Sequence, residues 1–310
     1  PNAAVSAVRL GLHSALVSNL GADENGKKCL VTLAAEGVDI EQVTIHQRAR
    51  TNYHFVLSFG AERTILVKHE AYSYALPHFA PPRWLYLSSL GAGTEAYHEE
   101  IAAWLEENPG TQLAFQPGSF HIAASGEPVM KKLYARAEVV VCNVEEAERI
   151  TSRARSETHF QNVWSEGRIA ATRALPRTFE NAVPRSARVP GDTSRIRTLL
   201  SEIHSLGPRI VCITDGPNGA YMLDESGAYF MPPYPDPKPP INRTGAGDAF
   251  ASTFVSYLAL GKAPLEALCR APINSAFVVQ HIGAQKGLLA RDALETYLHN
   301  APADYQPRQI

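Results

Sequence analysis

Thr244-Gly245-Ala246-Gly247-Asp248-Ala249-Phe250 is the stretch that decides the fold, and an apolar helical pattern follows it through Phe254 and Leu258 to Gly261. Two glycines allow a tight turn that points several backbone N–H groups into one concavity, and the following helix N-terminus adds partial positive charge. Such a turn binds anions such as phosphate groups. Asp248 lies at its mouth, where a carboxylate can accept a proton from a hydroxyl that attacks phosphorus. A plain helix N-terminus with an acidic first turn would have the same composition, so the motif alone leaves both interpretations open.

Short apolar runs alternate with segments of helical length on both sides of this motif. Strands are expected over residues 15–18, 84–87, 113–115, 139–142 and 210–214. Helices are expected over residues 26–36, 95–106, 144–150, 194–206 and 247–260. Strands that are apolar on both faces and separated by helices predict a mostly parallel sheet between two helical layers, an α/β/α sandwich. Ligands of such sheets bind beyond the carboxyl ends of the strands.

Two further polar motifs directly follow predicted strands. Asn143 and Glu146 come after the strand that ends at Cys142, and Thr214-Asp215-Gly216-Pro217-Asn218-Gly219-Ala220 closes the strand over 210–214. Both motifs are therefore expected at the ligand-binding edge of the sheet. The spacing of Asn143 and Glu146 equally fits a helix N-cap with an acid three residues later, and the two roles can coexist. The Asp215-Gly216 dipeptide is also common in ordinary turns.

Taken in order, these motifs resemble those of the ribokinase-like (PfkB) carbohydrate kinase family. Residues 242–250 are similar to its C-terminal signature, residues 214–220 to its nucleotide loop, and Asn143-Val144-Glu145-Glu146 to its N-x-x-E element. The region 43–70, which alternates over 53–59 and 64–67, resembles its lid hairpin, although an ordinary edge hairpin has the same pattern. The resemblance implies a single kinase domain over residues 1–310 with a ribokinase-like fold. Chains of the family begin with a strand that this sequence is expected to lack.

The resemblance also implies the chemistry, which is ATP-dependent transfer of a phosphoryl group to a hydroxyl, a primary alcohol, of a sugar or sugar derivative. Asp248 would be the base, and the backbone of Gly245, Ala246 and Gly247 would stabilise the transferring phosphoryl group. Glu146 would hold Mg²⁺ through water. The residues implied in binding ATP are Asn143, Glu146, Thr214, Asp215, Gly216, Gly219, Arg243, Asn274 and Gly283. Arg243 and Asn274 fit surface positions equally well. Some members bind K⁺ beside the catalytic loop, where Asn242 replaces a frequent aspartate.

The acceptor site is implied by the same resemblance. Asn2 aligns with a sugar-binding asparagine, and Gln116 follows the predicted strand over 113–115. Tyr53 or Phe55 would face the ligand from the lid, opposite the reacting hydroxyl at Asp248. A nucleoside kinase on the same scaffold is the first alternative. A homologue that binds a sugar or nucleotide without catalysis is the second, although the presence of Asp248 argues against it.

Bulk composition predicts a soluble cytoplasmic enzyme acting on a small molecule. The 310 residues are 45% hydrophobic and 19% charged with a formal net charge of −2, which favours neither nucleic-acid nor membrane binding. No apolar run reaches the roughly 20 residues of a membrane span. The four cysteines are far apart, which predicts reduced thiols.

The arginine-rich, proline-interrupted segment 151–195 is expected to be a flexible insertion, with a partner-binding element as the alternative. A homodimer formed through the lid is a further expectation from the family.

Overall fold

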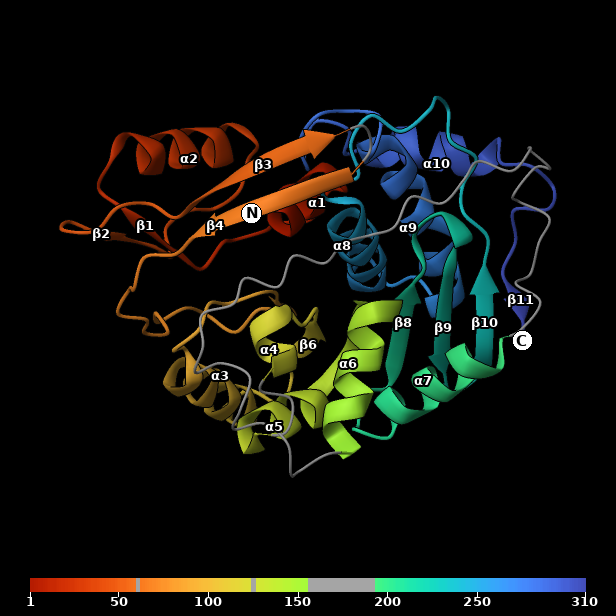
Figure 1. Ribbon diagram of the computed structural model, residues 1–310, viewed down its shortest axis with the longest axis horizontal. Helices are drawn as coiled ribbons and strands as arrows, with labels where there is room; N and C mark the ends of the chain where they lie inside the picture. The colour runs from red at the N-terminus through yellow and green to blue at the C-terminus, as the bar shows by residue number, and fades with distance from the viewer. Residues whose placement is uncertain (60–61, 124–126, 156–192) are drawn as a thin grey trace.

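A computed structural model describes residues 1–59, 62–123, 127–155 and 193–310, with a seven-stranded sheet at its centre (Figure 1). The strands in spatial order are β11 (Arg308–Gln309), β10 (Gly227–Met231), β9 (Ala220–Asp224), β8 (Ile210–Thr214), β7 (Ala137–Asn143), β6 (Gln112–Phe115) and β5 (Trp84–Leu87). Strands β5 to β8 pair in parallel, whereas β9 is antiparallel to β8 and β10, and β11 is antiparallel to β10. The predicted mostly parallel sheet is confirmed, with an antiparallel edge that the sequence patterns did not predict.

Helices cover both faces of this sheet, as predicted. The first layer contains α3 (Glu95–Glu107), α5 (Pro128–Arg136), α6 (Val144–Arg155) and α7 (Ser194–His204). The second contains α8 (Ala246–Ala259), α9 (Pro264–Val278) and α10 (Arg291–His299). Consecutive residues of β7 belong to different cores: Val140 packs with the first layer, and Val139 and Val141 pack with the second. This arrangement explains why the strand is apolar at four consecutive positions, residues 139–142, since each buried valine contributes about 1.5–3 kcal/mol by leaving water.

The N-terminal region lies beside the sandwich and is joined to it by its first helix (Figure 1). Helix α1 (Asn2–Arg9) packs against α8 through a third apolar cluster that includes Val5 and Ala249. Strands β1 (Ser18–Gly21) and β2 (Val43–His46) pair in parallel, and α2 (Glu24–Ala35) connects them. The strand predicted over 15–18 is displaced, because Ala15 forms only an isolated bridge with Asp39 and the paired strand begins at Ser18. Helix α2 begins two residues earlier than predicted because the Asp23 carboxylate caps it, accepting from Gly26 N at 2.9 Å.

Region 43–70, predicted to be a lid hairpin, contains two strands that pair with each other, and its role as a lid stays a prediction. Strands β3 (Tyr53–Phe59) and β4 (Glu62–Lys68) pair antiparallel, and their tip at residues 60–61 lies outside the described residues. The predicted insertion 151–195 is described only at its two ends, where α6 extends to Arg155 and α7 begins at Ser194. The prediction for residues 156–192 therefore stays a prediction. In the described part of the chain, every helix is too short or too polar to cross a membrane. All four cysteines are free thiols, as predicted.

Candidate active site

The turn before α8 is made by one glycine. Gly245 is the N-cap residue of α8 and has a φ of +84°, the left-handed conformation that glycine tolerates best. A Cβ at this position would overlap Ala284, whose Cα would be only 2.7 Å away. Gly247 has no positive φ, and a Cβ there would meet no atom within 4 Å. The expectation that both glycines make the turn is therefore wrong, because Gly247 instead leaves open space beside the helix N-terminus.

The first turn of α8 has the donors expected of an anion site. The first α-helical hydrogen bond runs from Ala249 N to Gly245 O at 2.8 Å, so the N–H groups of Gly247 and Asp248 precede the helical ladder. Ala246 N donates to Arg243 O at 3.4 Å and so contributes to the turn itself. The N–H groups that remain for an anion at this turn are therefore mainly those of Gly247 and Asp248.

Asp248 is the centre of a group of polar side chains from three distant segments. Its Oδ2 accepts from Asn2 Nδ2 at 2.8 Å, and its Oδ1 accepts from Gln116 Nε2 at 3.2 Å. Asn2 lies in the first turn of α1, Gln116 directly follows β6, and Asp248 is the third residue of α8. Each carboxylate oxygen has a second lone pair, so the half-buried carboxylate can still accept a hydrogen bond from a ligand. The structure therefore brings three of the predicted site residues together.

The predicted N-x-x-E element lies at the carboxyl edge of the sheet and caps α6. Asn143 Oδ1 accepts from Glu146 N at 2.8 Å, and Glu146 Oε2 accepts from Asn143 N at 2.9 Å, which is a reciprocal capping box. Asn143 ends β7 opposite Thr214 at the end of β8. Burial raises the pKa of the Glu146 carboxyl, the Asn143 N–H partly offsets this, and the charge of Asp248 adds to the rise. Asn143 ends β7 and Gln116 follows the parallel neighbour β6, so the capping box and the Gln116 contact of Asp248 lie at the same edge of the sheet.

The β8–β9 connection is a compact turn beside the capping box. Asp215 N donates to Gly219 O at 2.8 Å, and Asn218 Nδ2 donates to Asp215 Oδ2 at 3.1 Å across a short 3-10 helix, Gly216–Asn218. Gly219 has a φ of +112°, and a Cβ there would lie 2.5 Å from Met231 O. Gly216 has a φ of +51° with open space around it. The turn interpretation is correct, and the turn occupies the position expected for a nucleotide loop.

The structure places Asn274 neither at the protein surface nor at a nucleotide site, the two positions that the sequence allowed. The residue is fully buried, its Nδ2 donates to Thr253 Oγ1 at 2.8 Å, and its Oδ1 accepts from Leu289 N at 2.9 Å. The amide therefore links α9 to α8 and to the 283–289 loop inside the protein. Neither a nucleotide contact nor a surface position describes it, because a buried amide keeps its hydrogen-bond partners.

The segments that flank the Gly245 turn are fixed by short contacts. Asn242 is buried, and its Oδ1 accepts from Thr244 N at 2.7 Å, whereas the Arg243 side chain is exposed. Gly283 has a φ of +95° and begins the loop whose next residue, Ala284, lies against Gly245. Asn242 and Gly283 are thus next to the Gly245 turn, and Arg243 faces solvent from it.

The ring-bearing side chains of the hairpin lie on both of its faces. Tyr53 and Phe55 are 37% and 61% exposed, and their rings meet edge to face with centroids 5.4 Å apart. His54 points to the opposite face, where its ring lies 5.9 Å from His69, which in turn lies 5.9 Å from Phe120 of α4 (Ser119–Ala123). The face that bears His54 is turned toward α4. Tyr53 and Phe55 thus lie on the opposite face of the hairpin from His54, and their role in binding the ligand stays a prediction.

Two residues that the sequence did not single out complete the Asp248 group. Tyr86 OH donates to Gln116 Oε1 at 2.5 Å, and Gln285 Nε2 donates to Asn2 Oδ1 at 2.9 Å. Tyr86 lies within the apolar strand β5, and Gln285 lies in an irregular loop. Neither position forms part of a motif, so only long-range contacts identify them.

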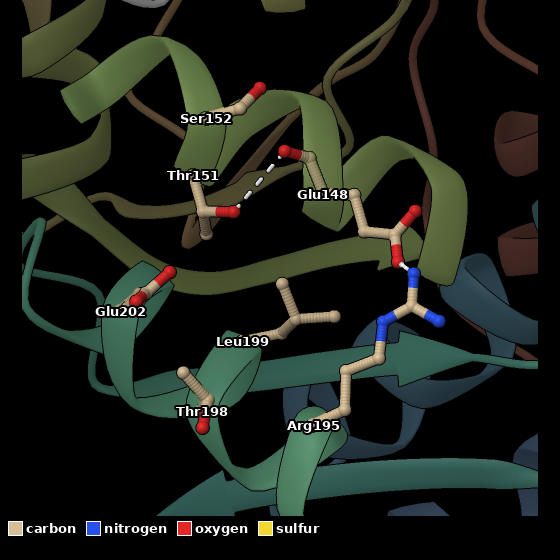
Figure 2. A pocket seen from close by; sticks show the side chains of 7 residues that line it. All are labelled: Glu148, Thr151, Ser152, Arg195, Thr198, Leu199 and Glu202. Carbon is tan, nitrogen blue, oxygen red and sulfur yellow. Dashed lines mark hydrogen bonds and ion pairs between the residues drawn. The ribbon is translucent and has the colours of Figure 1, made fainter. Parts of the chain in front are cut away.

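A hollow of about 360 Å³ between α6 and α7 is distinct from this site (Figure 2). It is lined by Glu148, Thr151, Ser152, Arg195, Thr198, Leu199 and Glu202. Arg195 pairs with Glu148, and Thr151 Oγ1 donates to the main-chain oxygen of Glu148 at 3.2 Å. None of these lining residues belongs to the predicted site, so the hollow contributes nothing to the Asp248 group.

A helix-covered, mostly parallel sheet with a glycine turn at a helix N-terminus and a carboxylate at its carboxyl edge is an architecture of many α/β proteins that bind phosphorylated ligands. The sequence profile of the pfkB family carbohydrate kinases matches residues 1–291. The chain belongs to the pfkB family of carbohydrate kinases.

Individual relatives agree with this assignment. The chain is 30% identical to a fructokinase of Salmonella typhimurium over 125 residues, 37% of this chain and 41% of that enzyme. It is 24% identical to a 2-dehydro-3-deoxygluconokinase of Thermoproteus tenax over 306 residues, 93% of this chain and 80% of that enzyme. The crystal structure of a Vibrio cholerae fructokinase with bound fructose, ADP and calcium ion superimposes with a TM-score of 0.71 at 22% identity, covering 96% of this chain and 89% of that one. The ribokinase-like fold predicted from the sequence is thereby confirmed.

Proposed function

We propose that this protein is an ATP-dependent phosphotransferase that phosphorylates a hydroxyl, a primary alcohol, of a sugar or sugar derivative. The observation that carries the proposal is the position of the Asp248 carboxylate. It lies in the first turn of α8, next to the Gly245 turn, with one oxygen bonded to Asn2 and the other to Gln116. A base in a phosphoryl-transfer site needs this combination of a positioned carboxylate and an adjacent anion hole.

In the proposed reaction, Asp248 accepts the proton of the attacking hydroxyl. The amide nitrogens of Asn2 and Gln116 each have a second N–H that is available to a substrate hydroxyl. The same two side chains can therefore orient the acceptor and the base, which lowers the entropic cost of bringing them together. Family membership and similarity to two sugar kinases support a sugar as the acceptor.

The N-terminal turn of α8 is proposed to stabilise the transferring phosphoryl group. The N–H groups of Gly247 and Asp248 precede the helical ladder and add to the positive end of the helix dipole. The open space where a Cβ of residue 247 would lie allows a phosphate to approach the backbone. Gly247 would thus be required for access rather than for backbone conformation.

The nucleotide and its metal ion are assigned to the neighbouring strand ends. Glu146 and Asn143 provide side-chain oxygen atoms, the type of ligand that Mg²⁺ prefers, at the same edge of the sheet as Asp248. Within the described residues there is no cluster of three metal-binding side chains, which fits an ion that is held mainly by phosphates and water. Bound Mg²⁺ would neutralise charge on the phosphates of ATP. The β8–β9 turn with Thr214, Gly216 and Gly219 would lie against the nucleotide, and Gly283 and Arg243 would flank its phosphates.

Potassium binding is proposed at Asn242. Its Oδ1 already accepts from Thr244 N at 2.7 Å, and an amide oxygen has a second lone pair for a cation. Since an amide lacks the charge of the aspartate often found at this position in the family, a modest stimulation by K⁺ over Na⁺ is expected.

The hairpin is proposed to act as a lid and as a dimer contact. Tyr53, Phe55, Leu57 and Leu66 share one face of β3–β4, and Phe55, Leu57 and Leu66 are 61%, 57% and 49% exposed. A second copy of the chain would cover these apolar residues. Double replacement of Phe55 and Leu57 by serine is expected to shift the sedimentation coefficient to that of a monomer. Val31→Ser, at an exposed valine of α2, is the control.

The proposed activity is tested by measuring ADP release with a panel of sugars, sugar acids, sugar phosphates and nucleosides. Acceptor-dependent release with a sugar, abolished in Asp248→Asn, supports the proposal. Turnover of nucleosides alone would instead establish the nucleoside kinase alternative. Ligand binding in calorimetry without any turnover would establish a non-catalytic homologue and overturn the proposal.

A further inference from the structure

Two hydrogen-bond relays converge on Asp248, one on each carboxylate oxygen. The first runs from Tyr86 OH to Gln116 Oε1 and from Gln116 Nε2 to Asp248 Oδ1. The second runs from Gln285 Nε2 to Asn2 Oδ1 and from Asn2 Nδ2 to Asp248 Oδ2. We propose that Tyr86 and Gln285 are positioning residues that fix the orientation of the two amides and, through them, the Asp248 carboxylate. This inference rests on the proposed function of Asp248 as the base.

The orientation of an amide matters because its two ends differ. In the observed orientation, the N–H ends of Asn2 and Gln116 face the carboxylate and their oxygen ends face away. A rotation of either amide by half a turn would place its oxygen against a carboxylate oxygen, two acceptors without a proton between them. A donor that satisfies the amide oxygen on the far side stabilises the productive orientation. Each relay contains such a donor.

Tyr86 is suited to this role because it stays protonated. Burial, reinforced by the negative charge of Asp248, raises the pKa of the Tyr86 phenol well above its usual value. The hydroxyl therefore remains a donor over the whole pH range in which an enzyme of this kind works. Its 2.5 Å distance to Gln116 Oε1 is short for a hydrogen bond between neutral groups. Tyr86 is fixed by β5, whose pairing with β6 aligns it opposite Ala114.

Gln285 is anchored by its own backbone. Arg9 Nη1 donates to Gln285 O at 2.9 Å and to Leu288 O at 2.8 Å. The same guanidinium pairs with both carboxylate oxygens of Glu36, at 2.6 and 2.9 Å. Arg9 thus joins α1, the end of α2 and the 283–289 loop, and a bidentate pair of this kind holds its geometry well. The fixed backbone holds the Gln285 side chain where its Nε2 donates to Asn2 Oδ1.

The first test is Tyr86→Phe, which removes one hydroxyl and keeps the ring. The expected result is a fall in kcat/KM for the acceptor of about 5- to 10-fold, the effect of one hydrogen bond, with KM for ATP unchanged. The acid limb of the pH profile of kcat/KM should move to higher pH, because a less well-oriented donor stabilises the carboxylate less. The matched control is Tyr305→Phe, which removes a buried hydroxyl that donates to Cys269 O at 2.8 Å far from the site. This control should keep the wild-type rate and pH profile.

A double-mutant cycle separates orientation from simple packing. Gln116→Leu removes the amide, so Tyr86→Phe should reduce kcat/KM by less than about 2-fold in that background. Gln285→Leu belongs to the other relay, and its effect should persist in the Gln116→Leu background. If Tyr86→Phe reduced kcat/KM equally in the wild-type protein and in Gln116→Leu, the hydroxyl would act through packing, and the relay would be overturned.

The outcomes also distinguish this inference from the proposed function. A wild-type rate and pH profile in Tyr86→Phe, together with an inactive Asp248→Asn, would overturn the relay and leave the function standing. Wild-type turnover in Asp248→Asn would overturn the base assignment, and the relay with it. Reduced kcat/KM with a displaced acid limb in Tyr86→Phe, abolished by Gln116→Leu, would establish the relay.

Discussion

The Asp248 group and the Asn143–Glu146 capping box lie on one edge of the sheet but are built in opposite ways. The partners of Asp248 are 246 and 132 residues away in the sequence, whereas Asn143 and Glu146 are three residues apart. The capping box forms wherever a helix begins at Val144, because its geometry is local. The Asp248 group forms only after α1, β6 and α8 have packed. A carboxylate held by distant partners is therefore more sensitive to changes elsewhere in the protein than a carboxylate held within its own helix.

The substitution with the largest expected effect is Asp248→Asn, which tests the Asp248 group alone. The change preserves the size of the side chain but removes the proton acceptor. Turnover should fall roughly 10²-fold or more, the order expected for loss of a general base, with nucleotide affinity little changed. Steady-state kinetics and calorimetric titration with nucleotide measure the two effects. Turnover within a few-fold of wild type would contradict the base assignment.

Gly245 and Gly247 give a matched pair within the same turn. Gly245→Ala should destabilise the protein by at least about 1–3 kcal/mol, because alanine is strained at a φ of +84° and would overlap Ala284. Gly247→Ala should unfold at the same denaturant concentration as wild type or higher, since its Cβ meets no neighbour and alanine favours a helix.

Urea unfolding measures this difference between the two variants. A loss of activity in a stable Gly247→Ala variant would show that a ligand approaches residue 247. Equal losses of stability in the two variants would contradict the assignment of the turn to Gly245.

A buried pair of histidines close to Gln116 gives the Asp248 side of the site its own pH dependence. Gly118 N donates to His121 Nδ1 at 3.1 Å, and His121 Nε2 lies 2.7 Å from His98 Nε2. Burial, reinforced by the charge of His98, lowers the pKa of His121 to about 3. Below pH ~6.5 the unfolded chain binds a proton that the folded protein excludes, so the free energy of unfolding should fall by about 1.4 kcal/mol per pH unit as the pH decreases toward 3.

Urea unfolding between pH 7 and 5 tests this dependence. In His121→Gln, the change of the unfolding free energy with pH should be smaller by about 1.4 kcal/mol per pH unit, which corresponds to one proton fewer taken up on unfolding. His78→Gln, at an exposed histidine, should leave the slope unchanged and serves as the control. An identical slope in wild type and His121→Gln would contradict the prediction.

The smallest effect is expected at the capping box, where two substitutions separate the cap from the metal. Asn143→Ala should cost about 1 kcal/mol of stability through loss of the cap. Glu146→Gln should keep the cap, because glutamine also serves in a capping box, and should raise the Mg²⁺ concentration required for activity. Thermal unfolding and Mg²⁺ titrations of ADP release measure the two effects. An unchanged Mg²⁺ requirement in Glu146→Gln would leave Glu146 with the capping role alone.

The strongest sequence predictions concerned segments whose structure depends on neighbours in the chain. The strands over 84–87 and 210–214 were placed at the observed bounds, and α8 was placed within one residue. The errors have identifiable causes. The β9–β10 hairpin was missed because its strands include Asp224 and Gly227 and follow each other through a short turn, without the intervening helix that marks the other strands. Asn274 was misplaced because its burial depends on Thr253 and Leu289, which the pattern of α9 does not reveal.

The sequence by itself determined the alternation of strands and helices, the Gly245 turn and the capping box, because hydrophobic period, left-handed glycine and cap spacing are local properties. Only the tertiary structure decided which side chains surround Asp248. Asn2, Gln116, Tyr86 and Gln285 come from four separate segments, and their convergence follows from how α1, β5, β6 and the 283–289 loop pack around the N-terminus of α8. Hydrogen bonds act over about 3 Å, so residues that are distant in the chain can cooperate only where packing has already brought their backbones together.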